Sequence, residues 1–408
     1  MEEKISVVLV GINGYGSLYL RELLSNQDAR IQLNGVVDIN PEFSDYYDEL
    51  IGRQIPIYQS IESFYKEKQA DLAIISTPIH LHKEQACFCM NYGSHVLCEK
   101  PMTANPKDVQ VMKDTRDKTG KFLAIGFNWS FIPSILELKK DIIKGIFGKP
   151  IRFKSMVQWP RNESYYNRSP WAGKKYSTDG SMIFDSVANN ATAHFLHNLL
   201  YLNGDNVDTS SKIDTLEAEL YRVNNIETFD TCVTYIKTIN NVDIYFYASH
   251  ATKENKEPCF QLEFENATIT YESDGDFNDI VAAWNDGTSK IYKGPENQNH
   301  LTKLSISLDA ISNKNYQIPC GIEASIPHVL SIQAMHESVP LVKEFPQTIV
   351  RYDDFEKQFW IQDLSKILNY CYTNCFLPSE TDTNWALRGK KINVSQLSKN
   401  IFHSQPDS

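Results

Sequence analysis

The stretch VVLVGINGYGSLYL, residues 7–20, decides the fold of the first part of the chain. An aliphatic run ends at Gly11 and a helical pattern begins at Gly16, so the stretch predicts a strand, a tight turn and a helix. Gly11, Asn13 and Gly16 stand at the spacing of the dinucleotide fingerprint G-x-G-x-x-G, with Asn13 in its second position. This context predicts a dinucleotide-binding turn, in which we expect cofactor contacts from Gly11, Asn13, Gly14, Tyr15 and Gly16.

Asp38 ends the next apolar run and indicates which dinucleotide is bound. A carboxylate at this place accepts hydrogen bonds from the adenosine ribose and repels a 2′-phosphate. No arginine follows Asp38 in the sequence INPE to reverse that preference. The expected cofactor is therefore NAD.

Working outward, residues 1–128 alternate short apolar runs with amphipathic stretches. Such alternation predicts βαβ units around a parallel sheet that helices cover on both faces, an α/β Rossmann domain. The expected strands are 5–10, 31–37, 71–76, 95–99 and 122–127, and the expected helices include 17–25, 82–92 and 105–120.

After a helix within 132–150 the pattern changes to period-2 alternation with aromatic and β-branched residues. Consecutive strands without helices between them predict an α+β domain over 129–408 with a predominantly antiparallel, open sheet. The expected strands are 151–159, 213–223, 228–238, 242–251 and 260–273; residues 273–320 are expected as loops and short strands, and 355–375 as a helix.

The composition argues against several classes of function. The 408 residues carry a net charge of −11, which argues against a protein that binds nucleic acid or anionic membranes. Eight cysteines without a C-x-x-C pair predict reduced, buried thiols and a cytoplasmic protein. The start MEEKISVVLV predicts neither a signal peptide nor a transmembrane span.

Two elements between residues 75 and 106 carry a family resemblance: Thr77-Pro78-x-x-x-His82 and Glu99-Lys100-Pro101. Together with the first turn they resemble the Gfo/Idh/MocA oxidoreductases, and AIGFNWSFIPS (124–134) and later stretches extend the resemblance to about residues 5–204. Many members of the family have an arginine pair where this chain has Trp129-Ser130, so the resemblance does not carry over a substrate or cofactor contact made by that arginine. The resemblance implies cofactor contacts from Thr77, Pro78, His82, Glu99, Lys100 and Asn128.

Lys100 is the main catalytic candidate. It follows a parallel strand at the carboxyl edge, where ligands of such sheets bind. Burial and a neighbouring cationic ring would shift a lysine toward neutrality and let it accept a proton from a reacting hydroxyl.

The stretch 178–204 resembles a family helix with a catalytic histidine, but it holds extra residues. Counting back from Gly204 makes His194 the histidine and Asn190 its partner, both on one helical face, with Asp185 as a further orienting group. Counting forward from Asp185 instead places Asn189 at the position of the family's catalytic histidine. We prefer the first alignment, which leaves His197 as a helix-face residue.

The loop 158–180 mixes aromatic and cationic side chains, which suit a carbohydrate and any acidic group on it, although such a loop also suits a subunit contact. The expected substrate residues are Lys100, Trp159, Arg161, Tyr165, Trp171, Lys174 and His194.

We therefore expect an NAD-dependent oxidoreductase that transfers a hydride between nicotinamide and a hydroxyl carbon of a sugar, polyol or sugar derivative. Two alternatives stay open: a glycosidase or lyase that uses NAD transiently without net redox change, and a non-catalytic NAD-sensing regulator. No metal site is expected, because the histidines have no cysteine or carboxylate at metal spacing. The second sheet is expected to form a homodimer or homotetramer.

Overall fold

The computed structural model describes residues 4–25, 28–275, 278–295 and 299–403. The chain divides into two compact units: Met1–Thr103, Lys107–Phe131 and His300–Ser325 form the first, and Ala104–Pro106, Ile132–Asn299 and Ile326–Ser408 form the second. The expected single boundary between 128 and 129 differs from this division, because the chain returns to the first unit at His300–Ser325.

The first unit contains a six-stranded sheet in the order β3-β2-β1-β4-β5-β6, with every pair parallel. This is the strand order of a doubly wound dinucleotide-binding fold, as expected. The strands are β1 (Ile5–Val10), β2 (Ile31–Val37), β3 (Ile57–Tyr58), β4 (Leu72–Ile75), β5 (His95–Cys98) and β6 (Leu123–Ile125).

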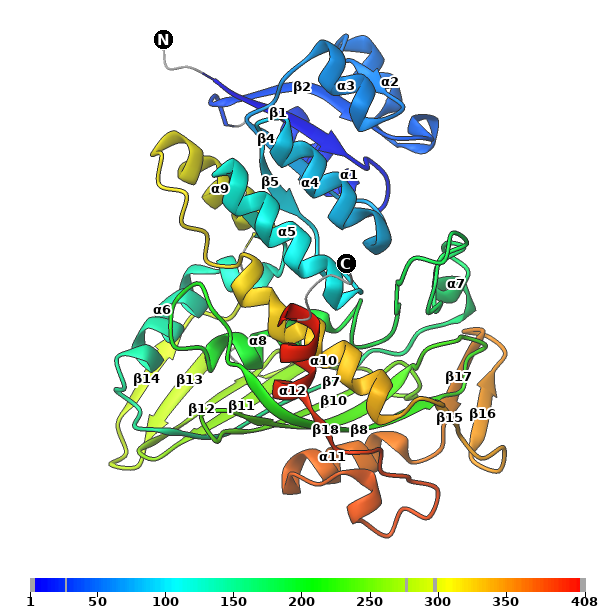
Figure 1. Cartoon of the computed structure of the whole chain (residues 1–408). Coiled ribbons are helices and arrows are strands. Elements are labelled where there is room, and N and C mark those ends of the chain that lie inside the picture. Colours follow the sequence, from blue (N-terminus) through cyan, green and yellow to red (C-terminus); the bar gives the residue numbers. More distant parts are fainter. Residues whose placement is uncertain (1–3, 26–27, 276–277, 296–298, 404–408) are drawn as a thin grey trace. The chain divides into compact units, whose positions relative to one another are not determined.

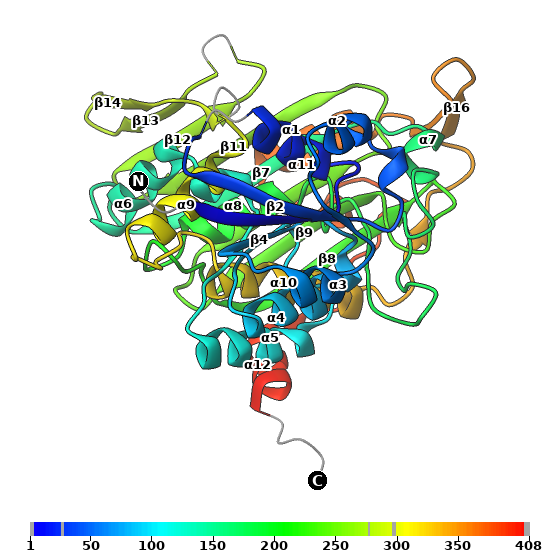
Figure 2. The same ribbon diagram turned by 90° about the horizontal axis from the view of Figure 1, so that it is seen from above.

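Helices cover both faces of this sheet (Figure 2), which explains why β4, β5 and β6 are buried along their whole length. Figure 2 shows α1 and α2 on one side of the strands, and α3, α4 and α5 on the other. The helices are α1 (Gly16–Ser25), α2 (Tyr47–Gly52), α3 (Ile61–Glu67), α4 (His82–Asn91), α5 (Pro106–Thr119) and α9 (Thr302–Ser312), and the 3-10 turns are η1 (Pro41–Phe43), η2 (Ile79–Leu81) and η3 (Asn128–Phe131).

The stretch 273–320, expected as loops and short strands, contains the strands β13 (Ile280–Trp284) and β14 (Ser289–Tyr292) and also α9. Leu301, Leu304 and Leu308 are buried at helical spacing, and α9 contacts β1 and η3. The prediction of loops and short strands alone over 273–320 was therefore wrong. Residues 276–277 and 296–298 lie outside the described residues.

The second unit is built on a ten-stranded sheet (Figure 1), mostly antiparallel as expected. The two parallel pairs are β7 with β10 and β8 with β15. The strands are β7 (Pro150–Gln158), β8 (Ile213–Arg222), β9 (Thr231–Thr238), β10 (Asp243–Ser249), β11 (Lys256–Phe264), β12 (Ala267–Glu272), β13, β14, β15 (Lys343–Glu344) and β18 (Ile392–Asn393), with β16 (Val350–Asp353) and β17 (Gln358–Ile361) as a separate hairpin. The other elements are α6 (Pro133–Ile143), α7 (Glu163–Tyr166), α8 (Ala193–Leu202), α10 (Ile322–Ser338), α11 (Leu364–Asn374), η5 (Pro378–Glu380) and α12 (Val394–His403).

One face of the central strands is covered by the chain itself. In Figure 1, α8 and α11 lie on opposite sides of this sheet, and both contact β7. Met156, Val233 and Tyr247 from three strands share a buried cluster with Leu364 and Leu368 of α11. The sheet is open as expected, but the face of these strands that was expected to be available to a partner subunit is covered here by α11.

Two elements differ from the expected ones. The expected strand 260–273 is two strands, β11 and β12, because residues 265–266 turn and bond to Lys149 and Phe147 backbone oxygens. The expected helix 355–375 begins only at Leu364, because the β-forming QFWI segment pairs as β17 with β16. All eight cysteines are free thiols, and all but Cys87, which is partly exposed, are buried as expected.

Candidate functional site

The sequence motifs of the first unit meet at one edge of its sheet. Val10 is the register partner of both Val37 and Ile75, and Ile75 is the partner of Cys98. The residues that follow these four positions therefore leave the sheet side by side at its carboxyl edge, where ligands of parallel sheets bind.

The first turn requires its glycines. Gly11 has a φ of 83°, and a side chain there would meet the Ser76 carbonyl oxygen at 2.5 Å. A side chain at Gly16 would meet the Gly11 carbonyl oxygen at 2.0 Å. The close approach of strand, turn and helix that the fingerprint predicts is therefore present.

Asn13 replaces the second glycine of the fingerprint and joins the turn to the residues after β2. Its amide nitrogen lies 3.3 Å from an Asp38 carboxylate oxygen and 3.1 Å from the Asn40 carbonyl oxygen. The Ile12 backbone N–H donates to the same Asp38 oxygen at 2.9 Å. Asp38 is thus held at the end of β2, in the place predicted to bind the ribose.

His82 is buried between two motifs. Its Nε2 lies 2.8 Å from the Thr77 carbonyl oxygen, and its Nδ1 lies 2.8 Å from the Pro101 carbonyl oxygen. Because both ring nitrogens face backbone carbonyl oxygens, His82 joins the two segments, and its contact with the cofactor stays a prediction. The Thr77 hydroxyl donates to Gln85.

Glu99 and Lys100 follow β5 with different surroundings. Glu99 is buried, and its carboxylate accepts from the Tyr19 hydroxyl at 2.7 Å and from the Lys100 backbone N–H at 3.3 Å. Lys100 is half-buried, and its peptide bond to Pro101 is cis. Burial and the charge of Glu99 raise the pKa of Tyr19 well above its usual value, so Tyr19 stays a donor.

Lys303 of α9 forms an ion pair with Glu99. Its ammonium also donates to the Asn128 side-chain oxygen at 2.7 Å. Sequence reasoning missed Lys303, which lies in a stretch expected as loops. The leucine spacing of α9 could have revealed the helix, but no local signal identifies the partner of its lysine.

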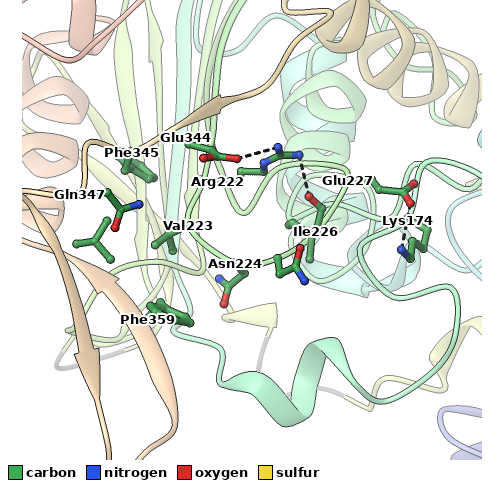
Figure 3. A pocket seen from close by; sticks show the side chains of 12 residues that line it. Lys174, Arg222, Val223, Asn224, Ile226, Glu227, Glu344, Phe345, Gln347 and Phe359 are labelled. Atoms are coloured by element: carbon green, nitrogen blue, oxygen red, sulfur yellow. Dashed lines mark hydrogen bonds and ion pairs between the residues drawn. The ribbon is translucent and has the colours of Figure 1, made fainter.

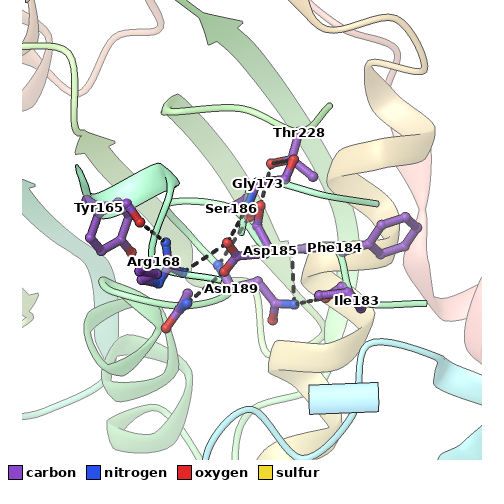
Figure 4. Close-up of polar contacts among 10 residues, drawn as sticks. Tyr165, Arg168, Gly173, Ile183, Phe184, Asp185, Ser186, Asn189 and Thr228 are labelled. Atoms are coloured by element: carbon purple, nitrogen blue, oxygen red, sulfur yellow. Dashed lines mark hydrogen bonds and ion pairs between the residues drawn. The ribbon is translucent and has the colours of Figure 1, made fainter. Parts of the chain in front are cut away.

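The second unit holds a second polar cluster, centred on Asp185 (Figure 4). The buried Asp185 carboxylate accepts from the Gly173 backbone N–H at 2.6 Å, from Arg168 at 3.1 Å and from the Asn190 amide at 2.7 Å. Arg168, one of the cationic side chains of the 158–180 loop, is thereby fixed, and its guanidinium lies 4.0 Å from the centre of the Tyr165 ring.

Asn190 and His194 are not on one helix, so that expectation is wrong. Helix α8 begins at Ala193, and Asn190 lies in the preceding turn, where its N–H bonds the Ser186 carbonyl oxygen. Asn189, the alternative from the forward count, is buried, and its amide donates to the carbonyls of residues 183 and 184. His194 lies in the first turn of α8, and the choice between the two alignments stays a prediction.

His197 is buried in α8 and not on its surface. Its ring stacks on Tyr201, and burial holds its pKa well below the usual value. A core role for His197 follows from these contacts.

The aromatic loop connects to the start of α8. The Trp159 ring packs edge-on against Phe195, the neighbour of His194, with ring centres 5.4 Å apart. The Arg161 guanidinium lies 5.6 Å from the Trp159 ring centre and 5.1 Å from that of Tyr165. Arg168 also lies 4.9 Å from the Trp171 ring centre.

Lys174 points elsewhere. Its ammonium pairs with Glu227 at 3.0 Å and lines a pocket of about 570 Å³ (Figure 3). An Arg222–Glu344 ion pair lines the same pocket. Lys174 is thus separated from the Asp185 cluster by the direction of its side chain.

Within the described ranges, no group of three or more His, Cys, Asp or Glu side chains could hold a metal ion. None of the helices described is long and apolar enough to cross a membrane.

A family model described as "Oxidoreductase family, NAD-binding Rossmann fold" matches residues 5–127. This span contains the glycine turn, Asp38 and the Glu99-Lys100 motif. Residues 5–127 belong to the Gfo/Idh/MocA oxidoreductase family. The family resemblance expected from the motifs is thus confirmed for this span.

Two comparisons extend beyond the family model. The Bacillus subtilis glucose-6-phosphate 3-dehydrogenase is 26% identical over 156 residues, which are 38% of this chain and 42% of that protein. The match thus spans less than half of that relative's length. The WlbA dehydrogenase of Bordetella pertussis, solved with NADH and UDP-GlcNAcA, superposes with a TM-score of 0.66 at 19% identity, covering 83% of this chain and 97% of that one. At that identity the likeness shows a shared fold alone.

Proposed function

We propose that this chain is an NAD-dependent dehydrogenase that oxidises a hydroxyl carbon of a sugar, polyol or sugar derivative. The observation that carries the proposal is the alignment of Gly11, Asp38 and Lys100 at one carboxyl edge of the parallel sheet. Relatives whose names state sugar or inositol dehydrogenases support the substrate class.

The residues present fit NAD. The glycine turn ends at the first turn of α1, whose backbone N–H groups can bind a pyrophosphate. Asp38 faces the ribose position and disfavours a 2′-phosphate. NAD, when bound, supplies the hydride acceptor.

Lys100 is the proposed proton acceptor. As the carbinol carbon gives up its hydride, the hydroxyl proton passes to the neutral amine of Lys100, which becomes an ammonium, and the substrate becomes a carbonyl compound. His194, oriented at the start of α8, and the Asn190–Asp185 pair are the proposed substrate-side groups of the second unit.

A screen of sugars, polyols and sugar phosphates with purified protein and excess NAD tests the proposal. We expect NADH to accumulate in proportion to the substrate consumed. Cleavage of a nitrophenyl glycoside without net NADH, together with deuterium exchange at C2, would instead favour the redox-neutral alternative. Tight NAD binding without turnover of any compound would favour a regulator.

A further inference from the structure

Lys303 is a lysine whose ammonium is removed from solvent, with 1% of the residue exposed. Burying an unpaired ammonium is strongly unfavourable, so such a group persists only where acceptors surround it. Here the Glu99 carboxylate and the Asn128 oxygen accept directly, and the Gly126 carbonyl oxygen lies 3.4 Å away. The ammonium also lies 4.8 Å from the ring centre of Tyr15.

The contact with Glu99 bears on Lys100. One Glu99 oxygen faces Lys303 and the Tyr19 hydroxyl, and the other faces the Lys100 backbone N–H. A side chain on Gly126 would meet the Glu99 carboxylate at 2.9 to 3.0 Å, so the carboxylate is enclosed as well. Lys303 is therefore the counter-charge of a buried carboxylate that holds the main chain of Lys100.

The contact with Asn128 bears on the glycine turn. The Asn128 oxygen faces the ammonium, and its amide nitrogen lies 3.3 Å from the Tyr15 hydroxyl, which also lies 3.4 Å from the ammonium itself. Tyr15 belongs to the fingerprint turn and is 37% exposed. One buried cation thus fixes the orientation of groups at both the turn and the Glu99-Lys100 motif.

We propose that Lys303 is a positioning residue of the first unit, which acts through Glu99 on Lys100 and through Asn128 on the cofactor turn. The proposal rests on the proposed NAD-dependent function. It assigns a role in cofactor binding and proton transfer to a helix whose lysine lies 204 residues after Glu99 and 288 residues after Tyr15 in the sequence.

The test compares Lys303→Met with Lys139→Met. Lys139 is also fully buried, but it lies in the second unit, where it donates to the Tyr201 carbonyl oxygen at 2.6 Å and lies over the Tyr201 ring. Both variants lose a buried lysine, so both are expected to lower the melting temperature. Only Lys303→Met should also weaken NAD binding, measured by tryptophan fluorescence, by about tenfold, the loss of one charged hydrogen-bond network.

A second variant keeps the test decisive if Lys303→Met does not fold. Glu99→Gln with Lys303→Met removes both charges, so no buried charge stays unpaired. We expect this pair to restore part of the melting temperature but neither NAD affinity nor turnover. Wild-type NAD affinity and turnover in either folded variant would overturn the role of Lys303. Failure of the unaltered chain to bind NAD would instead refute the proposed function.

Discussion

The two units each set a cation against a buried carboxylate, but they do so differently. In the first unit the Lys303 side chain has no exposed surface, and its partner Glu99 is 204 residues away in the sequence. In the second unit the Arg168 side chain keeps 26% exposure, and Asp185 is 17 residues away. Each carboxylate also accepts from two neutral donors: Tyr19 and the Lys100 backbone for Glu99, and the Gly173 backbone and Asn190 for Asp185.

The difference separates a fixed site from an adjustable one. The Glu99–Lys303 ion pair is buried, so removal of either partner leaves the other charge buried and unpaired. A half-exposed arginine stacked on aromatic rings can exchange its carboxylate contact for water or a ligand. We expect the first pair to matter for stability and cofactor geometry, and the second for substrate binding.

The largest expected effect is the loss of stability when one charge is removed from each ion pair. Glu99→Gln leaves Lys303 buried without a counter-charge and should lower the free energy of unfolding by about 3 to 5 kcal/mol. Asp185→Asn should cost about 1 to 2 kcal/mol, since water can reach Arg168 and neutral donors remain. Urea unfolding of both variants measures the two values, and equal losses would contradict the distinction.

Loss of the proton acceptor comes next. Lys100→Met keeps the side-chain stem but cannot carry a proton, so turnover should fall by about 10² or more while NAD affinity changes little. Lys121→Met is the matched control, a half-buried lysine that precedes β6 at the amino edge of the same sheet. Most of the activity surviving in Lys100→Met would exclude its catalytic role.

Substitution of His194 and of His197 in α8 distinguishes the two alignments of the second unit. His194→Ala should lower turnover by about tenfold or more and change its pH profile, as expected for a proton-relaying imidazole. His197→Ala should lower the melting temperature and leave the pH profile unchanged, because burial already keeps His197 neutral at physiological pH. The reverse ranking, measured by steady-state kinetics and thermal unfolding, would favour the forward alignment.

The smallest expected effect concerns Asp38. Asp38→Ser keeps a hydrogen-bonding oxygen but removes the charge, so NAD binding should weaken by about 1 kcal/mol and the preference for NAD over NADP should narrow. Titration of both cofactors by fluorescence measures the change. Equal affinities of the unaltered protein for NAD and NADP would contradict the assignment of Asp38.

The features that the sequence predicted correctly are those that depend on residues close together in the chain. Strands β1 and β2 lie where their apolar runs predict them, and the glycine turn follows from close approaches that only glycine permits. The turn before α8 was missed, because Asn190 interrupts an apparently continuous helix by bonding Asp185. Lys303 could not be paired with Glu99, since its contact depends on how distant segments pack.

The covered face of the second sheet has a consequence for assembly. Helix α11 is tethered to the strands that it covers, so its effective concentration is set by the length of the connecting chain and does not fall on dilution. A partner subunit covering the same strands would dissociate as the protein is diluted. The packing of Met156, Val233 and Tyr247 is therefore independent of protein concentration.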